Sequence, residues 1–262
     1  MSRFCTLCSS SKGNCYYISG GGASLLVDAG MGPRNLKKAL DSLDVRLEEL
    51  LGIVITHEHT DHVKGLCSLT RKLRLPIYAS AGTLSALEAM EAVPPGAVLV
   101  ELTGGRELGG IGIQSFAIPH DAADPVGLRF CLPDGRTVGI ATDLGHVNDA
   151  IRSALTGCDL VLLESNYDPA MLRAGSYPWF LKRRVEGEKG HLSNEAGALL
   201  ATYLAQRGTT RFVLGHLSQN NNLPDIAYLT TRGALEEAGA REGVDYLLSV
   251  APAQTPHPVI VF

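Results

Sequence analysis

The sequence contains no long apolar run, and its beginning lacks the pattern of an export signal. Residues 1–5 have no charged segment that is followed by a hydrophobic one, so we expect no signal peptide. No apolar stretch reaches the length that a membrane-spanning helix needs. These two absences predict a cytoplasmic protein with no membrane partner.

An excess of positive charge is also missing. The 262-residue chain carries 23 lysines and arginines against 27 aspartates and glutamates, a net charge of -4. This balance argues against tight, non-specific binding of nucleic acid by charge alone. It leaves room for a nucleic-acid substrate held at a local basic patch. The hydrophobic share of 45% and the charged share of 19% are those of a soluble globular protein.

Paired cysteines, repeats and linkers are scarce or absent. Six cysteines are scattered along the chain, and the pair Cys5–Cys8 has no second pair to complete a zinc site. With no export signal, we expect these thiols to be reduced. No internal repeat, low-complexity segment or linker divides the sequence. The sequence therefore predicts one domain over residues 1–262.

The most informative stretch that is present is HEHTDHV at residues 57–63, directly after a five-residue apolar run. The run is long enough for a buried strand and too short for a helix, so three imidazoles and a carboxylate emerge where a strand ends. Neutral imidazole and carboxylate are ligands that zinc and similar metals prefer. Unpaired histidines at the edge of a core would cost stability. The spacing separates His57 and His59 from Asp61 and His62, which indicates two metal ions.

The rest of the chain reads as short strands and helices in alternation, which is typical of a layered α/β sandwich. Strands are expected at residues 3–8, 15–19, 23–28, 52–56, 77–79, 98–101, 109–118, 127–132, 137–141, 160–163, 211–215, 245–248 and 259–262. Helices are expected at residues 33–43, 63–73, 83–90, 148–155, 177–185, 194–206 and 224–239, with Ser193 as an N-cap.

Four other strand ends carry polar side chains. Asp28 either caps a turn or orients a ligand histidine through the second ring nitrogen, and we favour the second interpretation. His120, Asp143 and His216 supply the ligands that the 57–63 stretch lacks. The expected first metal site is His57, His59 and His120, the expected second site is Asp61, His62 and His216, and Asp143 bridges them.

These residues carry a resemblance to a known family. Residues 57–62 match the HxHxDH motif of the metallo-β-lactamase superfamily, and Asp28, His120, Asp143 and His216 follow the order of its remaining motifs. Residues 9–14, 164–168, 190–195 and 216–221 resemble more narrowly the YycJ/WalJ branch of bacterial metallo-hydrolases. That branch is similar to the metallo-β-lactamase cores of ribonuclease Z and ribonuclease J. The resemblance covers nearly the whole chain and implies a four-layer αββα sandwich with the metals at one edge of the two sheets.

Departures from neighbouring branches narrow the expected activity. His59 stands where flavodiiron proteins have a glutamate, which disfavours iron redox chemistry. The segment between Asp143 and His216 is too short for the β-CASP domain of ribonuclease J. Nothing between His62 and His120 resembles the long RNA-gripping arm of ribonuclease Z, which argues against processing of structured tRNA.

The function that the resemblance implies is that of a dinuclear metal-dependent phosphodiesterase, a nuclease that trims single-stranded DNA or RNA from the 5′ end. Two divalent ions, zinc in the first place and manganese as the alternative, would supply a bridging hydroxide. Asp61 would orient the hydroxide. In ribonuclease Z-like enzymes, the histidine that matches His191 assists the leaving group and binds no metal.

Substrate contacts are expected on both sides of this centre. Ser10 and Asn14 in the first turn, and the basic run Lys182, Arg183 and Arg184, are candidates to hold neighbouring phosphates. An equally good interpretation of the basic run is that it forms a solvated helix face. His146 either supports a ligand or contacts the substrate.

Two other classes of function remain as alternatives. One is a small-molecule hydrolase that acts on a cyclic phosphodiester, a thioester or a lactam. The other is a non-catalytic, metal-binding regulatory protein, which the intact set of ligands disfavours.

Overall fold

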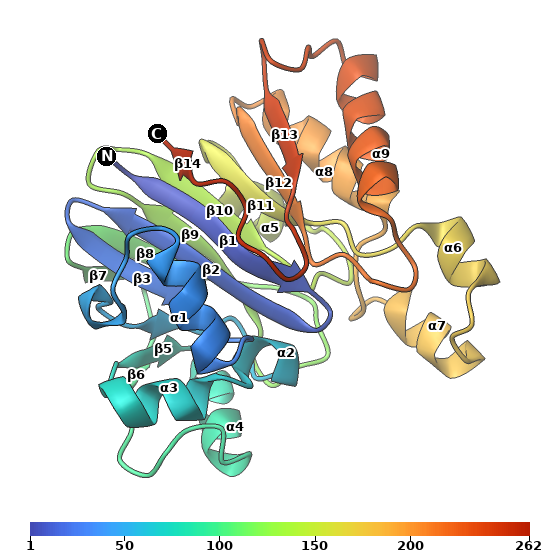
Figure 1. Cartoon of the computed structure of the whole chain (residues 1–262). Helices are drawn as coiled ribbons and strands as arrows, with labels where there is room; N and C mark the ends of the chain where they lie inside the picture. Colours follow the sequence, from blue (N-terminus) through green and yellow to red (C-terminus); the bar gives the residue numbers. More distant parts are fainter.

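Two seven-stranded β-sheets form the body of the protein (Figure 1). The structure, a computed structural model, describes residues 1–262. The first sheet has the strand order β14-β1-β2-β3-β4-β5-β6, and the second has the order β13-β12-β11-β10-β9-β8-β7. The strands of the first sheet are β1 (Arg3–Ser10), β2 (Gly13–Gly20), β3 (Ala23–Val27), β4 (Ile53–Val54), β5 (Ile77–Ala79), β6 (Leu99–Glu101) and β14 (Ile260–Val261). Those of the second sheet are β7 (Arg106–Leu108), β8 (Ile111–Ala117), β9 (Val126–Cys131), β10 (Thr137–Ala141), β11 (Leu160–Glu164), β12 (Arg211–Gly215) and β13 (Leu247–Val250).

The helices cover the two outer faces and one end of the sandwich (Figure 1). Those that precede the second sheet in sequence are α1 (Pro33–Asp41), α2 (Thr60–Val63), α3 (Leu66–Leu73) and α4 (Ala81–Ala89), with a short 3-10 turn at Leu47–Glu49. The later helices are α5 (Asp149–Leu155), α6 (Pro169–Ala174), α7 (Trp179–Val185), α8 (Asn194–Ala205) and α9 (Pro224–Glu237). In Figure 1, α6 and α7 stand apart from the sheets as a small lobe. No helix in the structure has the length and apolarity of a membrane span.

Three large hydrophobic clusters explain the layering. One cluster contains Phe4 and Tyr16 from the first sheet together with Leu128 and Ile140 from the second, so it fills the space between the sheets. A second cluster joins the first sheet to α1 and α3, and a third joins the second sheet to α5 and α8. Strands buried on both faces read as continuous apolar runs, as in β11. The expected four-layer αββα sandwich is confirmed.

Most expected elements are present, and the exceptions have local causes. The helix predicted over residues 63–73 begins three residues later, as α3, and residues 60–63 form the separate short helix α2. Gly65 is the N-cap of α3 and lies against neighbouring backbone: a Cβ there would be 2.0 Å from the Met31 carbonyl oxygen. The final parallel strand, β13, lies two residues later than predicted. The prediction omits β7 and α6, which have three and six residues, although Asp168 and Pro169 are a typical helix start.

Candidate metal centre

The polar ends of several strands meet at one edge of the sandwich. Asp28 follows β3, Asp143 follows β10 two residues later, and His216 follows β12. All three have a positive φ, of 58°, 62° and 55° respectively. A positive φ is uncommon outside glycine, and such residues cluster at functional sites because the strain persists only where the surrounding structure fixes it. The three expected strand-end residues thus share a backbone conformation that the surrounding structure must hold in place.

His57, His59 and His120 form the first group of ligand atoms. Their nitrogens lie within 4.8 Å of one another, and His120 Nε2 is 3.2 Å from His59 Nδ1. His57 and His120 are buried, whereas His59 lies partly open to solvent. The structure thus brings together the three residues predicted for the first metal site.

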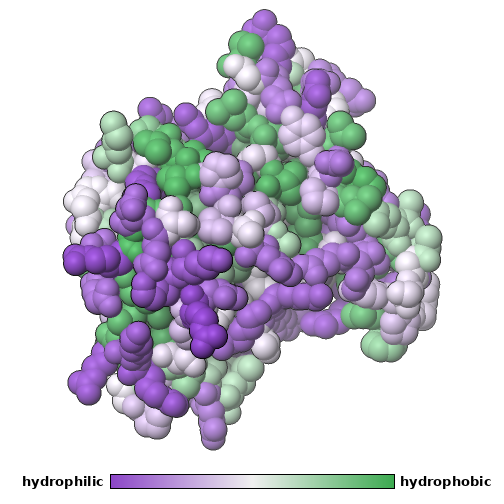
Figure 2. Space-filling view, viewed as in Figure 1, coloured by the Kyte–Doolittle hydropathy of each residue, from purple (hydrophilic) through white to green (hydrophobic).

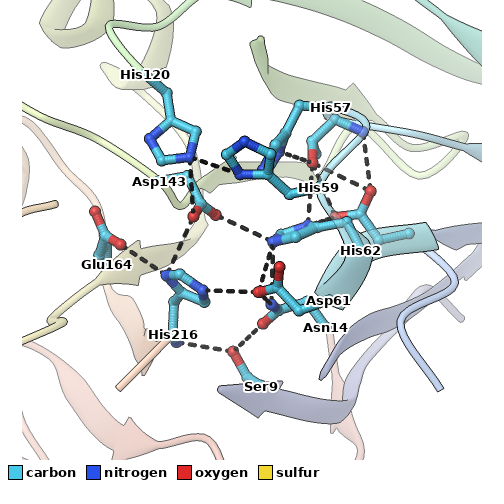
Figure 3. A network of polar contacts seen from close by, with 12 residues as sticks. Ser9, Asn14, His57, His59, Asp61, His62, His120, Asp143, Glu164 and His216 are labelled. Carbon is cyan, nitrogen blue, oxygen red and sulfur yellow. Dashed lines mark hydrogen bonds and ion pairs between the residues drawn. The ribbon is translucent and has the colours of Figure 1, made fainter. Parts of the chain in front are cut away.

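Asp61, His62 and His216 form the second group. Asp61 Oδ2 lies 3.4 Å from His216 Nε2 and 3.5 Å from His62 Nε2. Asp143 stands between the two groups (Figure 3): its Oδ2 is 3.3 Å from His62 Nε2, and its Oδ1 is 3.6 Å from His120 Nε2. This is the position that a bridging carboxylate requires.

Asp28 and Thr56 orient two of these histidines from behind. His62 Nδ1 donates to Asp28 Oδ2 over 2.8 Å, which leaves Nε2 for the centre. The Thr56 hydroxyl donates to the same carboxylate, at 3.0 Å from Oδ2, and so can accept from His57 Nδ1 at 3.1 Å. Outer partners of this kind fix the tautomer and orientation of a metal-binding imidazole. The geometry agrees with the role expected for Asp28.

Glu164, at the end of β11, orients two other histidines of the centre, His216 and His191. It is fully buried, and its Oε1 accepts from His216 Nδ1 at 2.8 Å and from His191 Nδ1 at 2.9 Å. Its Oε2 accepts from the backbone amides of Leu144 and Leu192. Burial raises the pKa of Glu164, but the neighbouring His191 and the hydrogen bonds from both histidines outweigh it and lower the pKa to about 2. We did not assign Glu164 to the site from the sequence, although it too ends a buried strand.

Unsatisfied buried atoms show that the donor set fits metal ions. His57 Nε2 and Asp143 Oδ2 are buried and have no hydrogen-bond partner. Such atoms are costly unless something else binds them. Burial lowers the pKa of His57, which keeps this imidazole neutral as a metal ligand must be. Burial opposes ionisation of Asp143, but the electrostatic effect of the neighbouring His216 and His62 lowers its pKa and keeps it a carboxylate.

The basic run on α7 has only one member beside the centre. Arg184 Nε lies 2.6 Å from Asp121 Oδ2, and Asp121 Oδ1 lies 3.5 Å from His120 Nε2. Lys182 instead donates to the Arg173 carbonyl oxygen, and Arg183 lies over the Trp179 ring. The surface-face interpretation therefore fits Lys182 and Arg183, while Arg184 is in position to act at the site.

Three other residues were expected to support a ligand or to contact the substrate. Asn14 and Ser10 are buried beside the ligands, and His146 is not. Asn14 is fully buried, and its Nδ2 donates to Asp61 Oδ2 at 3.2 Å. It is thus positioned to support Asp61 and not to touch a substrate. Ser10 is also buried, and it holds the Asn14 side chain through its backbone. His146 is half exposed and bonds the Glu188 carbonyl oxygen, away from the ligand groups.

Comparison with known proteins gives matches over most of the chain. Residues 24–217 match the pattern of the beta-lactamase superfamily domain. A Bacillus anthracis protein named exodeoxyribonuclease YycJ is 36% identical, and the match covers 90% of each chain. A Streptococcus pneumoniae protein named exodeoxyribonuclease WalJ is 35% identical, over 98% of this chain and 97% of that one. Among solved structures, the metallo-beta-lactamase fold protein YhfI from Bacillus subtilis agrees in fold, with a TM-score of 0.71 and 16% identity over 98% of this chain and 99% of its own.

Proposed function

The chain belongs to the beta-lactamase superfamily, and on that premise we propose that it is an exonuclease that removes nucleotides from single-stranded DNA. The resemblance seen in its motifs is thereby confirmed, and the chain is a metal-dependent hydrolase of this superfamily. The names of the two relatives favour DNA over RNA as the substrate. A single-stranded substrate and attack from the 5′ end are part of the proposal.

The observation that carries the proposal is that His191 lies beside two groups of metal ligands: it shares the Glu164 carboxylate with the ligand His216. His57, His59 and His120 would hold one divalent ion, Asp61, His62 and His216 a second, and Asp143 would bind both. Zinc or manganese ions held there would supply an activated water and positive charge at the scissile phosphate. The protein's own contribution is to keep these ligands oriented and the neighbouring proton donor in place.

We infer that His191 gives a proton to the departing oxygen. Its Nδ1 is engaged by Glu164, so Nε2 is the nitrogen left for a substrate. The side chain is 21% exposed and borders a hollow that also contacts Arg184 and Ser218. A general acid must reach the leaving group directly or through one water. A histidine that is fixed by a buried carboxylate but open on its other side meets this need.

The test uses the purified, metal-loaded protein with four kinds of substrate. Single-stranded DNA labelled at the 5′ or the 3′ end is compared with a chromogenic phosphodiester, a thioester and a lactam. We expect release of mononucleotides from the 5′ end and no turnover of the thioester or the lactam. Cleavage of no phosphodiester would overturn the proposal, and turnover of the chromogenic ester alone would favour a small-molecule enzyme.

His59→Ala is the matched variant for this test. It removes one ligand of the first group at a partly open position, so the core is left intact. We expect the variant to lose turnover and to bind less metal, which elemental analysis after gel filtration measures. Full activity in His59→Ala would contradict the assignment of the first metal site.

A further inference from the structure

A hollow next to the metal centre is lined by two lysines and no carboxylate, and we propose that it binds a phosphate of the DNA strand beside the scissile one. Its lining includes Ser10, Lys12, Gly13, Gly30, Asn35 and Lys64, and it has a volume of about 240 Å³. We call it the lysine pocket. The inference rests on the proposed function, because it names a second contact for the same strand.

The lysine pocket is one residue away from the second group of metal ligands. Ser10 and Gly13 line it, and the side chain of Asn14, which bonds the Ser10 backbone, contacts both Asp61 and His62. Lys64, the C-cap of α2 and two residues after His62, also lines it. A strand that places one phosphate on the metals therefore has a neighbouring phosphate within reach of the pocket.

The charge of the pocket is not compensated by the protein. Neither Lys12 nor Lys64 has a carboxylate within 4.0 Å, and Asn35 and Gln254 add only neutral amides. The region around the tip of the β1–β2 hairpin and α2 is strongly hydrophilic in the space-filling view (Figure 2). Two lysines that line one hollow and have no carboxylate partner are attractive to a phosphate, which lysine binds as a point charge.

Lys64 also has a structural contact that must be separated from this role. Its ammonium donates to the carbonyl oxygen of Lys12 and so fastens the tip of the hairpin. The Lys12 ammonium makes no hydrogen bond with the protein. A variant at Lys12 therefore tests charge alone, and Lys64→Gln removes the charge while it keeps an amide that can donate to the same carbonyl.

The tip of the β1–β2 hairpin lies between two hollows. Lys12 lies in the lysine pocket, whereas its neighbour Ser11 lines the hollow that contains Arg184 and His191. A strand that crosses the centre would meet His191 and Arg184 on one side of the tip and the two lysines on the other. Phosphate contacts of this kind fix the register of a strand but do not read its sequence.

The experiment compares Lys12→Ala, Lys64→Gln and the double variant with Lys72→Ala, an exposed lysine on α3 with no ion pair. Each is assayed on a single-stranded oligodeoxynucleotide and on bis(p-nitrophenyl) phosphate, which contains a single phosphate. We expect KM for the oligonucleotide to rise roughly three- to tenfold per lysine. The dependence of log KM on log salt should become shallower by about 0.7 per lysine. Turnover of the small ester should stay at the wild-type level.

The outcomes separate the two proposals. If the wild type cleaves the oligonucleotide and the double variant matches Lys72→Ala in KM and in salt dependence, the lysine pocket holds no phosphate. If the wild type cleaves no oligonucleotide, the proposed function itself fails. A double variant that loses turnover of the small ester as well would also overturn the inference, because the lysines would then act on the centre and not on a second phosphate.

Discussion

Glu164 is the residue on which two histidines of the centre depend. It accepts hydrogen bonds from His191 and His216, and two backbone amides hold it in place. In Glu164→Gln the side chain keeps its size but has one acceptor oxygen instead of two, so it cannot accept from the two imidazoles and the two backbone amides together. Loss of an outer partner costs about 10- to 100-fold in metal affinity or activity. We expect kcat to fall in that range, with less metal bound at low free metal concentration.

Glu188→Gln is the matched control for this substitution. The Glu188 side chain is 92% exposed, and its carboxylate lies 3.8 Å from His146, outside the centre. Steady-state kinetics and metal titrations of the two variants test the assignment side by side. Equal kinetics for both would show that Glu164 is only a structural residue.

His191 is expected to act on the reaction and not on metal binding. Replacing it with alanine removes the proposed proton donor, and general acid catalysis contributes about 10²- to 10⁴-fold. We expect a loss of kcat in that range with the metal content unchanged, measured on the oligonucleotide. The loss should be smaller for an ester whose leaving group is a good one, such as p-nitrophenolate. His146→Ala is the control, because it changes a histidine outside the ligand groups, and it should behave as the wild type. If His191→Ala protein binds less metal than the wild type, His191 is not a proton donor alone and the proposed role is wrong.

At the scale of elements, the loop after β3 is fixed by a close approach of backbones. A Cβ at Gly30 would be 1.7 Å from the Asp61 carbonyl oxygen and 2.5 Å from the Asn14 amide nitrogen. These are main-chain atoms that support the second ligand group, so they cannot give way as a flexible side chain would. Gly30→Ala should lower the free energy of unfolding by at least about 3 kcal/mol and weaken metal binding.

Gly32→Ala is the control two residues away. Nothing lies within 4 Å of a Cβ built there. Gly32 is the N-cap of α1, where alanine is less favourable than glycine, so a loss of at most about 1 kcal/mol is expected. Urea unfolding of both variants measures the difference, and equal stability would contradict the crowding at Gly30.

The start of β11 is tied to β10 by the carboxylate of Asp159. It accepts from Arg136 Nη1 at 2.7 Å and from the Thr137 amide at 2.8 Å. Burial raises the pKa of this carboxyl, but these hydrogen bonds outweigh it and lower the pKa. A carboxyl whose pKa is lower in the folded state stabilises the fold above its unfolded value of about 3.9, and the contribution is lost as the pH falls through the folded value.

Asp159→Asn should therefore destabilise the protein at pH 7 by about 1–2 kcal/mol, and the difference from the wild type should shrink below pH 4. Urea unfolding between pH 7 and pH 3 measures it. Asp41→Asn, which removes a carboxylate from an exposed pair with Lys37, should show little change at any pH. A difference for Asp159→Asn that is constant with pH would mean that its charge contributes nothing.

The elements that the sequence predicted well are those with a strong local signal. The apolar runs before Asp143 and His216 end where the strands end, because a buried strand cannot continue through unpaired polar side chains. The run before His57 predicted a strand over residues 52–56, whereas β4 covers only Ile53–Val54. Tertiary contacts decided the rest. The helix α3 begins after Gly65, a residue with low helix propensity, and the contact of Gly65 with the Met31 backbone is a tertiary one that residues 60–73 taken alone do not reveal.

At the scale of the whole molecule, the ligands of the centre come from both sheets. His57, His59, Asp61 and His62 follow β4 of the first sheet, while His120, Asp143 and His216 follow strands of the second. This set could be predicted because its members lie in the segments that follow strands. The roles of Glu164 and Asn14 could not, because each depends on which residue of the other segments it meets. Asn14 meets Asp61, 47 residues later in the chain, and Glu164 meets His216, 52 residues later.

Because the ligands join the two sheets, metal removal should affect the stability of the whole molecule and not its fold. The three large hydrophobic clusters contain none of the ligands, so the sandwich should persist without metal. An ion present at about 1,000 times its Kd stabilises the folded state by about 4 kcal/mol, which corresponds to roughly 8–16 °C in Tm for a chain of this size. Dialysis against a chelator should therefore lower Tm by that amount and leave the far-ultraviolet circular dichroism unchanged. Restored metal should reverse the shift in the wild type but not in His216→Ala, which lacks one ligand of the second group. A Tm that is the same with and without metal in the wild type would mean that the cluster at the sheet edges does not bind ions tightly in the folded state.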